Sequence, residues 1–210
     1  MSSARATNVA ALAAIAALAG VEHGIGEVLQ GNVVPASLMF PSWPKSEFFR
    51  VLAGEPAMTV VPNLLVTGIL AIIVSLTFLA WATVFVHRRN AGLVLIVLSF
   101  VNLLVGGGIA PLALGVIVGV AAMKIGVPLT GWRRRLHPRL GRSFAALWPW
   151  SIACCLLAWL MLFPGLPIIA HFLVVDGATV IPIIFLCALV LLVSSIFSGF
   201  AYDIEHETAT

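Results

Sequence analysis

A short stretch near the N-terminus combines residue types that could do chemistry. In AGVEHGIGEVLQGN, residues 19–32, two carboxylates, one imidazole and one amide follow an apolar, alanine-rich run. Helical side chains three, four and seven residues apart share a face. One stripe therefore comprises Gly20, His23, Gly24, Glu27 and Gln30, with Glu22 about a quarter-turn away. Imidazole and carboxylate groups together can exchange a proton for a cation near neutral pH, so this stripe predicts a binding site.

The composition indicates that a membrane surrounds this stripe. Of the 210 residues, 61% are hydrophobic and 9% are charged, whereas soluble domains are roughly half apolar and about a quarter charged. A soluble fold of this length could not bury so much apolar surface. We therefore expect an all-α, polytopic integral membrane bundle that forms a single domain over residues 1–210.

Five apolar runs predict the membrane-spanning helices, at residues 7–29, 62–86, 91–123, 144–163 and 179–202. A span needs about 20 apolar residues, so the third run is long for one helix and short for two. Gly106–Gly108 and Pro111 interrupt its middle, where a helix would break.

The basic residues help to decide how often this third run crosses. Two short helices would place Arg5, Arg88–Arg89 and the basic residues of 124–142 on one side, as the positive-inside rule prefers. We therefore predict six spans with both termini in the cytoplasm, in the plasma membrane. Five spans, with one long and tilted third helix, are the alternative.

The connecting segments follow from this topology. Residues 31–61 are expected to form an outer loop, with a short interfacial helix at about 44–53 whose aromatic side chains lie at headgroup depth. Residues 124–142 form a basic cytoplasmic loop, whose cluster at 133–142 attracts anionic lipids rather than nucleic acid. Residues 203–210 form a short, solvated cytoplasmic tail. The apolar segment 164–178 is expected to fold over or beside the site.

The same topology brings further polar residues to the outer side. The predicted binding residues are Glu22, His23, Glu27, Gln30, Asn63, Asn102, His171 and Asp176, and Glu55 lies on that side as well. Some have a simpler structural explanation. His23 and Glu27 are spaced to share a hydrogen bond within one helix, and Asp176 could cap the last helix. Glu22 could pair with Lys45 or Arg50 of the outer loop.

Three classes of function fit these residues. The first is a small permease or channel whose outer pocket handles a proton, a metal cation or a small polar solute, with His23 and Glu27 as ligands if the cofactor is a divalent metal ion. The second is an intramembrane enzyme for a lipid-like substrate, in which His171 and Asp176 join them around a metal that activates water. The third is a non-catalytic membrane subunit or assembly factor whose stripe locks the bundle. Each class allows a homo-oligomer.

Overall fold

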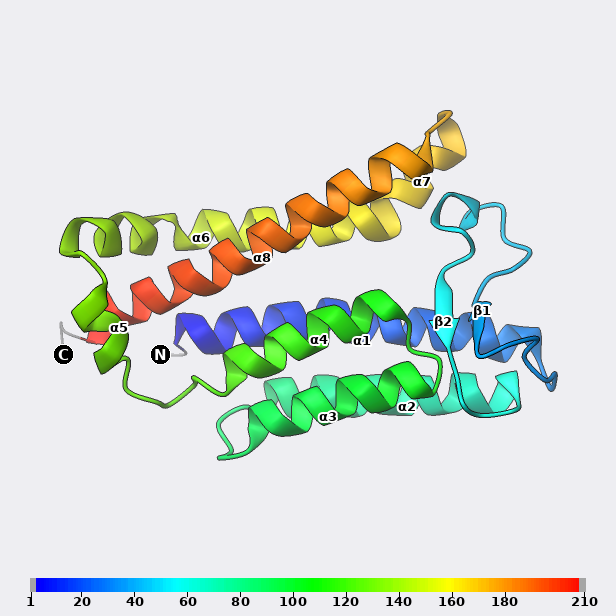
Figure 1. Cartoon of the computed structure of the whole chain (residues 1–210), viewed down its shortest axis with the longest axis horizontal. Coiled ribbons are helices and arrows are strands. Elements are labelled where there is room, and N and C mark those ends of the chain that lie inside the picture. Colours follow the sequence, from blue (N-terminus) through cyan, green and yellow to red (C-terminus); the bar gives the residue numbers. More distant parts are fainter. Residues whose placement is uncertain (1–2, 208–210) are drawn as a thin grey trace.

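The computed structural model describes residues 3–207, and this part of the chain is mostly helical (Figure 1). The longest helices are α1 (Ala4–Gln30), α2 (Leu64–Thr83), α6 (Pro138–Leu160) and α8 (Gly177–Glu207). Shorter ones are α3 (Ala91–Leu104), α4 (Ile109–Ala122), α5 (Thr130–Arg135) and α7 (Leu166–Phe172), and the turn η2 (Met161–Gly165) joins α6 to α7. Four segments are long and apolar enough to cross a membrane, namely Ala4–Gln30, Leu64–Thr83, Pro138–Phe172 and Gly177–His206.

The ambiguous apolar run 91–123 forms two helices. α3 and α4 lie side by side and run in opposite directions (Figure 1). Gly106 and Gly108, in the turn between them, have φ angles of 102° and 83°. Residues with a Cβ rarely adopt such angles, so the glycines allow the chain to reverse there. One long, tilted third helix is therefore not what this segment forms.

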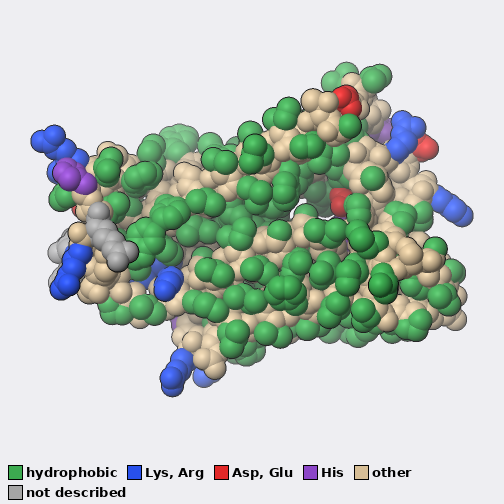
Figure 2. Space-filling view, in the orientation of Figure 1, with side chains coloured by type: hydrophobic (Ala, Val, Ile, Leu, Met, Phe, Trp, Pro, Cys, Tyr) green, Lys and Arg blue, Asp and Glu red, His purple; other side chains and the backbone are tan. Residues whose placement is uncertain are grey.

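The helices form two groups that meet at one end of the molecule. α1 to α4 form one group, and α6 packs along α8 in the other. α1 begins and α8 ends at the same end, which we call the terminal end (Figure 1). Most Lys and Arg side chains also gather there (Figure 2). Toward the opposite end, which we call the site end, the two groups diverge.

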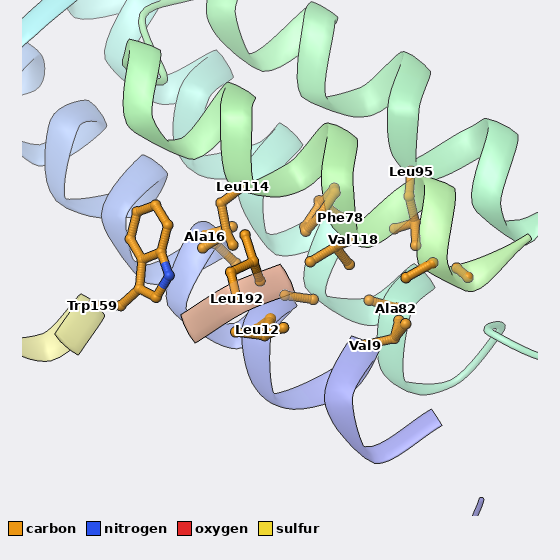
Figure 3. Packing of buried hydrophobic residues seen from close by; sticks show 14 of the residues in the cluster. Val9, Leu12, Ala16, Phe78, Ala82, Leu95, Leu114, Val118, Trp159 and Leu192 are labelled. Atoms are coloured by element: carbon orange, nitrogen blue, oxygen red, sulfur yellow. The ribbon is translucent and has the colours of Figure 1, made fainter. Parts of the chain in front are cut away.

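A packed apolar core joins the two groups near the terminal end. Small and branched side chains of α1, among them Val9 and Leu12, contact Phe78 of α2 and Val118 of α4 (Figure 3). Leu192 of α8 packs into the same cluster. The alanine-rich start of α1 thus faces other helices, because small side chains allow their backbones to approach closely.

The outer loop differs from its prediction. The expected interfacial helix at 44–53 is wrong, since this stretch contains only a 3-10 turn, η1 (Arg50–Leu52). It lies between two short antiparallel strands, β1 (Met39–Pro41) and β2 (Pro56–Met58). The aromatic residues pack inward as well, because the Phe49 ring stacks between Trp43 and Phe163, with ring centroids 4.9 and 5.8 Å away. These ring contacts therefore hold the loop against the helix bundle.

The expected solvated tail is also wrong for residues 203–207, which continue α8. Asp203 is buried, and its Oδ2 accepts a hydrogen bond of 2.6 Å from Nε of Arg5. Its Oδ1 accepts one from the backbone N–H of Ala4. Arg5 also donates to the carbonyl groups of Lys124 and Val127. This buried ion pair joins the first helix, the last helix and the turn after α4; residues 208–210 lie outside the described part.

Breaking this pair should destabilise the whole bundle. In Asp203→Asn, buried Arg5 would lose the carboxylate of Asp203, and loss of one partner of a buried pair costs about 3–5 kcal/mol. The matched control is Arg50→Gln, because the Arg50–Glu47 pair of 2.9 Å is 79% and 78% exposed and such pairs contribute less than about 1 kcal/mol. Unfolding in detergent micelles measures both variants. Equal melting temperatures would show that the pair does not hold the termini together.

Candidate functional site

The predicted polar stripe of α1 faces the interior of the bundle. Gly20, His23, Gly24 and Glu27 are buried, and Gln30 is half-buried. A Cβ at Gly24 would lie 2.7 Å from the carbonyl oxygen of Gly68, so the backbones of α1 and α2 are in direct contact. Small residues permit this close packing. The helical spacing thus identified the correct face of α1.

His23 is the centre of the polar cluster and only 3% exposed. Its Nδ1 lies 2.9 Å from the carbonyl oxygen of Ala19, one turn earlier in α1, and 3.1 Å from Oε2 of Glu22. Its Nε2 faces Oε2 of Glu55 at 3.6 Å. Because the Ala19 carbonyl can only accept, Nδ1 carries a proton, and Nε2 is left to face the carboxylate. The hydrogen bond expected between His23 and Glu27 is not formed among the described contacts.

Two carboxylates flank this imidazole, and one comes from the outer loop. Oε1 of Glu22 accepts a hydrogen bond from the indole N–H of Trp43, which replaces the expected pairing of Glu22 with Lys45 or Arg50. Glu55 lies between η1 and β2. Burial raises its pKa to about 7, an effect that the positive charge of His23 opposes and the negative charge of Glu22 reinforces.

Glu27 lies in a separate, closed compartment on the next turn of α1. The residue is 0% exposed, and its Oε1 accepts a hydrogen bond of 3.3 Å from the hydroxyl of buried Ser42. Its Oε2 has no hydrogen-bond partner among the described residues. Burying a carboxylate oxygen without a hydrogen-bond partner costs free energy of folding. Glu27 is therefore a neighbour of the His23 cluster and does not belong to it.

The triple glycine between α3 and α4 covers these polar side chains. A Cβ at Gly106 would lie 2.2 Å from Oε2 of Glu27, and one at Gly108 would lie 2.4 Å from Nε2 of His23. Gly107 lies equally close to Asn102, whose side-chain oxygen accepts a hydrogen bond of 3.2 Å from Ser75. Only residues without a side chain can wrap so tightly around the cluster. The Asn102 side chain thus packs against the glycine turn at Gly107.

A cavity of about 560 Å³ opens beside the cluster at the site end. It lies between α1 and α4 on one side and α6, η2 and α8 on the other, and it forms the hollow visible between the two groups in Figure 2. Most of its lining is apolar, including Ile15, Leu114, Trp159, Leu162, Phe163 and Ile181. Glu22, His23 and Glu55 are the ionisable residues among the described lining. The cavity is therefore an apolar space with one polar wall.

Two predicted site residues hold the outer loop in place and do not line this cavity. The amide nitrogen of Gln30 donates to the carbonyl oxygens of Pro41 and Ser42, at 3.3 and 2.9 Å. Asn63 caps α2, since its side chain accepts a hydrogen bond from the N–H of Val66. Both are polar because a helix end or a loop backbone needs a partner at that point.

His171 and Asp176, two further predicted site residues, are exposed and do not take part in the polar cluster of Glu22, His23 and Glu55. Neither is among the described residues that line the cavity. Asp176 accepts from the N–H of Ala178 and the hydroxyl of Thr179 at the start of α8, and these hydrogen bonds lower its pKa. It is therefore a helix cap. The segment between α6 and α8 does reach the cavity, but through Phe163, Pro164 and Gly177.

Glu55 and Ser42 are not among the predicted binding residues. Their only signal was a location in the loop that the topology placed on the same side as the stripe. A loop has no periodicity from which a facing direction can be read. No protein-family model, curated protein or solved structure matches this chain. The function must therefore be inferred from the site itself.

The fit of the glycine turn around Glu27 can be tested by adding one methyl group. Gly106→Ala should destabilise the protein by the cost of a positive φ angle, about 1–2 kcal/mol, plus about 1–3 kcal/mol for overpacking. Gly31→Ala is the matched control, because Gly31 has a φ of 83° and nothing within 4 Å of the added Cβ. Melting temperatures in detergent provide the comparison.

A double variant separates the collision from the backbone strain. When Glu27→Ala removes the carboxylate, Gly106→Ala should cost no more than Gly31→Ala. If the cost of Gly106→Ala is the same with and without Glu27, the close contact does not determine the stability of this turn.

Proposed function

We propose that the protein is an intramembrane enzyme that acts on the polar end of a lipid-like molecule held in the cavity. The observation that carries this proposal is the cavity itself, a large apolar space whose polar groups converge on one wall. Such a shape suits a ligand with an apolar body and a small polar end. The hollow between the two helix groups (Figure 2) would give a lipid a route into the cavity.

The polar wall contains groups that suit acid–base chemistry. His23 can exchange a proton at Nε2 while its Nδ1–H stays on the Ala19 carbonyl. Glu22 accepts a hydrogen bond from the Trp43 indole, and its Oε2 lies 3.1 Å from Nδ1 of His23, so it orients the imidazole. Glu55 has a pKa raised to about 7 by burial, so it can act as an acid or a base near neutral pH. These three residues are the proposed acting groups.

The lining supports this proposal over the other two classes of function. Ala16, Leu114, Trp159 and Leu162 line the cavity and also belong to the packed core, so the floor of the cavity is apolar. A permease or channel for a proton, metal cation or small polar solute needs polar groups along its path. A purely structural stripe would have its polar atoms paired and no cavity beside them, whereas Oε2 of Glu27 is unpaired among the described residues.

The cavity proposal predicts a bound amphiphile that a bulky side chain displaces. Mass spectrometry of an organic extract of the purified protein should identify this molecule. Ala110→Phe narrows the cavity and should reduce the co-purified amount at least tenfold, whereas Ala80→Phe, on an exposed face of α2, should not. In His23→Gln the molecule should stay bound, and the lipid change that the wild type produces in host membranes should be absent.

Two results would contradict the proposal. One is a wild-type protein that carries no specific amphiphile. The other is an equal amount in Ala110→Phe and wild type, both folded. If the amphiphile binds but host lipids are the same with wild type and His23→Gln, the protein binds lipid without converting it.

The arrangement of helices also supports a topology, which we propose as six crossings of the plasma membrane. α1, α2, α3, α4, α6 and α8 run alternately between the two ends (Figure 1). The basic residues at the terminal end would then face the cytoplasm, where the 133–142 cluster meets anionic lipids. The cavity would open in the outer half of the membrane.

Labelling of single cysteines in intact cells measures this topology. Arg89, Gly131 and Glu47 are exposed and suit cysteine substitution, in a background without Cys154, Cys155 and Cys187. Positions 89 and 131 should react with a membrane-impermeant reagent only after the cells are opened, and position 47 should react directly. Opposite sidedness of 89 and 131 would remove the double crossing by α3 and α4.

A further inference from the structure

Three potential ligand atoms converge at the polar wall of the cavity. Glu22, His23 and Glu55 each offer one atom, and these atoms all lie within 4.8 Å of one another. Two of the residues are neighbours on α1, and the third comes from the loop between η1 and β2. The loop is held in this place by hydrogen bonds of its own, such as the 3.0 Å contact from the N–H of Ser42 to the carbonyl oxygen of Glu55.

The orientation of the imidazole favours a cation between these groups. Because Nδ1 donates to the Ala19 carbonyl, Nε2 carries the lone pair of the neutral ring, and Oε2 of Glu55 lies 3.6 Å from this nitrogen. That separation is too long for a hydrogen bond. It is close to the distance of about 3.4 Å between two tetrahedral ligands of a zinc ion with bonds of about 2.1 Å. One imidazole nitrogen and two carboxylate oxygens are also ligand types that a divalent ion such as Zn²⁺ binds in proteins.

The glycine turn covers the face of the His23 ring. The position that a Cβ of Gly108 would take lies 2.4 Å from Nε2 and 2.8 Å from each of the two ring carbons beside it, so it lies over the ring face and away from the direction of the Nε2 lone pair. Gly108 therefore packs on the imidazole without occupying the position of an ion at Nε2. Hydrogen bonds to neighbouring groups also orient two of the ligand residues, His23 through the Ala19 carbonyl and Glu22 through the Trp43 indole. Hydrogen bonds of this kind fix the tautomer and direction of metal ligands.

We infer that Glu22, His23 and Glu55 hold a divalent metal ion whose remaining coordination position faces the apolar cavity. The inference rests on the proposed function and specifies its chemistry. With the ion bound, the three groups would act by holding it and not by exchanging protons, and the polar end of the lipid-like molecule would bind the ion through an oxygen donor. One imidazole and two carboxylates leave the fourth position of a tetrahedral zinc ion open. Glu27, which the sequence predicted as a ligand with His23, lies behind Gly106 and takes no part.

Titration of the purified full chain with Zn²⁺ alone, after chelation, tests the site. Calorimetry should show one ion bound per chain. Glu55→Gln should weaken binding at least tenfold, and His23→Gln should do the same. Glu47→Gln is the matched control, because it removes the same charge from the same loop at an exposed position paired with Arg50. Its affinity should equal that of the wild type.

A measurement on the wild type keeps the test valid if a variant does not fold. X-ray absorption at the zinc edge should show one imidazole nitrogen and oxygen ligands at about 2.0–2.2 Å. Spectra without an imidazole, a folded wild type that binds no Zn²⁺, or a folded Glu55→Gln with wild-type affinity would each overturn the inference.

The amphiphile measurement separates this inference from the function on which it rests. If Ala110→Phe loses the amphiphile and the wild type binds no Zn²⁺, the cavity function stands and the metal site is rejected. If the wild type binds Zn²⁺ through His23 but carries no amphiphile, the metal site stands and the lipid-like ligand is rejected. Zn²⁺ affinity in Ala110→Phe should stay within threefold of wild type, because Ala110 lies outside the ligand set.

Discussion

The burial of two carboxylates and an imidazole on one helix is the constraint on which the site end depends. A charged side chain near the centre of a bilayer costs roughly 2.5–3.5 kcal/mol, so α1 requires partners from elsewhere in the chain. The outer loop supplies them, with Ser42 on Glu27 and Trp43 on Glu22. This is why residues 40–58 fold into a strand pair against the bundle and not into a helix on the membrane surface.

The cavity follows from how differently the two ends of the molecule are closed. At the terminal end, the Arg5–Asp203 ion pair and the apolar core hold α8 against α1. At the site end, the α6–α8 pair meets the loop around η1, through the aromatic stack of Phe163 on Phe49 and the close approach of Gly177 to Val51. Helices that touch at one end and are separated by stacked rings at the other leave a wedge between them. The polar face of α1 borders this wedge.

The sequence predicted the helices and the buried face of α1, because both depend on patterns along one segment. Apolar runs indicate helix length, and the 3.6-residue period placed His23 and Glu27 on one face. The glycine break was visible for the same reason. The contribution of Glu55 depends on how a loop folds back, which no local pattern records. His171 and Asp176 were grouped with the site only because the predicted topology placed them on the same side of the membrane. Two residues on the same side can still lie far apart at that end of the molecule.

The glycine turn connects the two polar compartments that α1 creates. Gly106 lies against Glu27 and Gly108 against His23, one on each side of a single residue. Any shift of this turn would therefore change the surroundings of both groups at once. α4 begins directly after the turn and carries Ala110, Pro111 and Leu114 into the cavity wall. A ligand that presses on this wall would thus act on the same backbone that encloses His23. Filling of the apolar cavity is in this way coupled to the surroundings of His23, one of the residues proposed to do the chemistry.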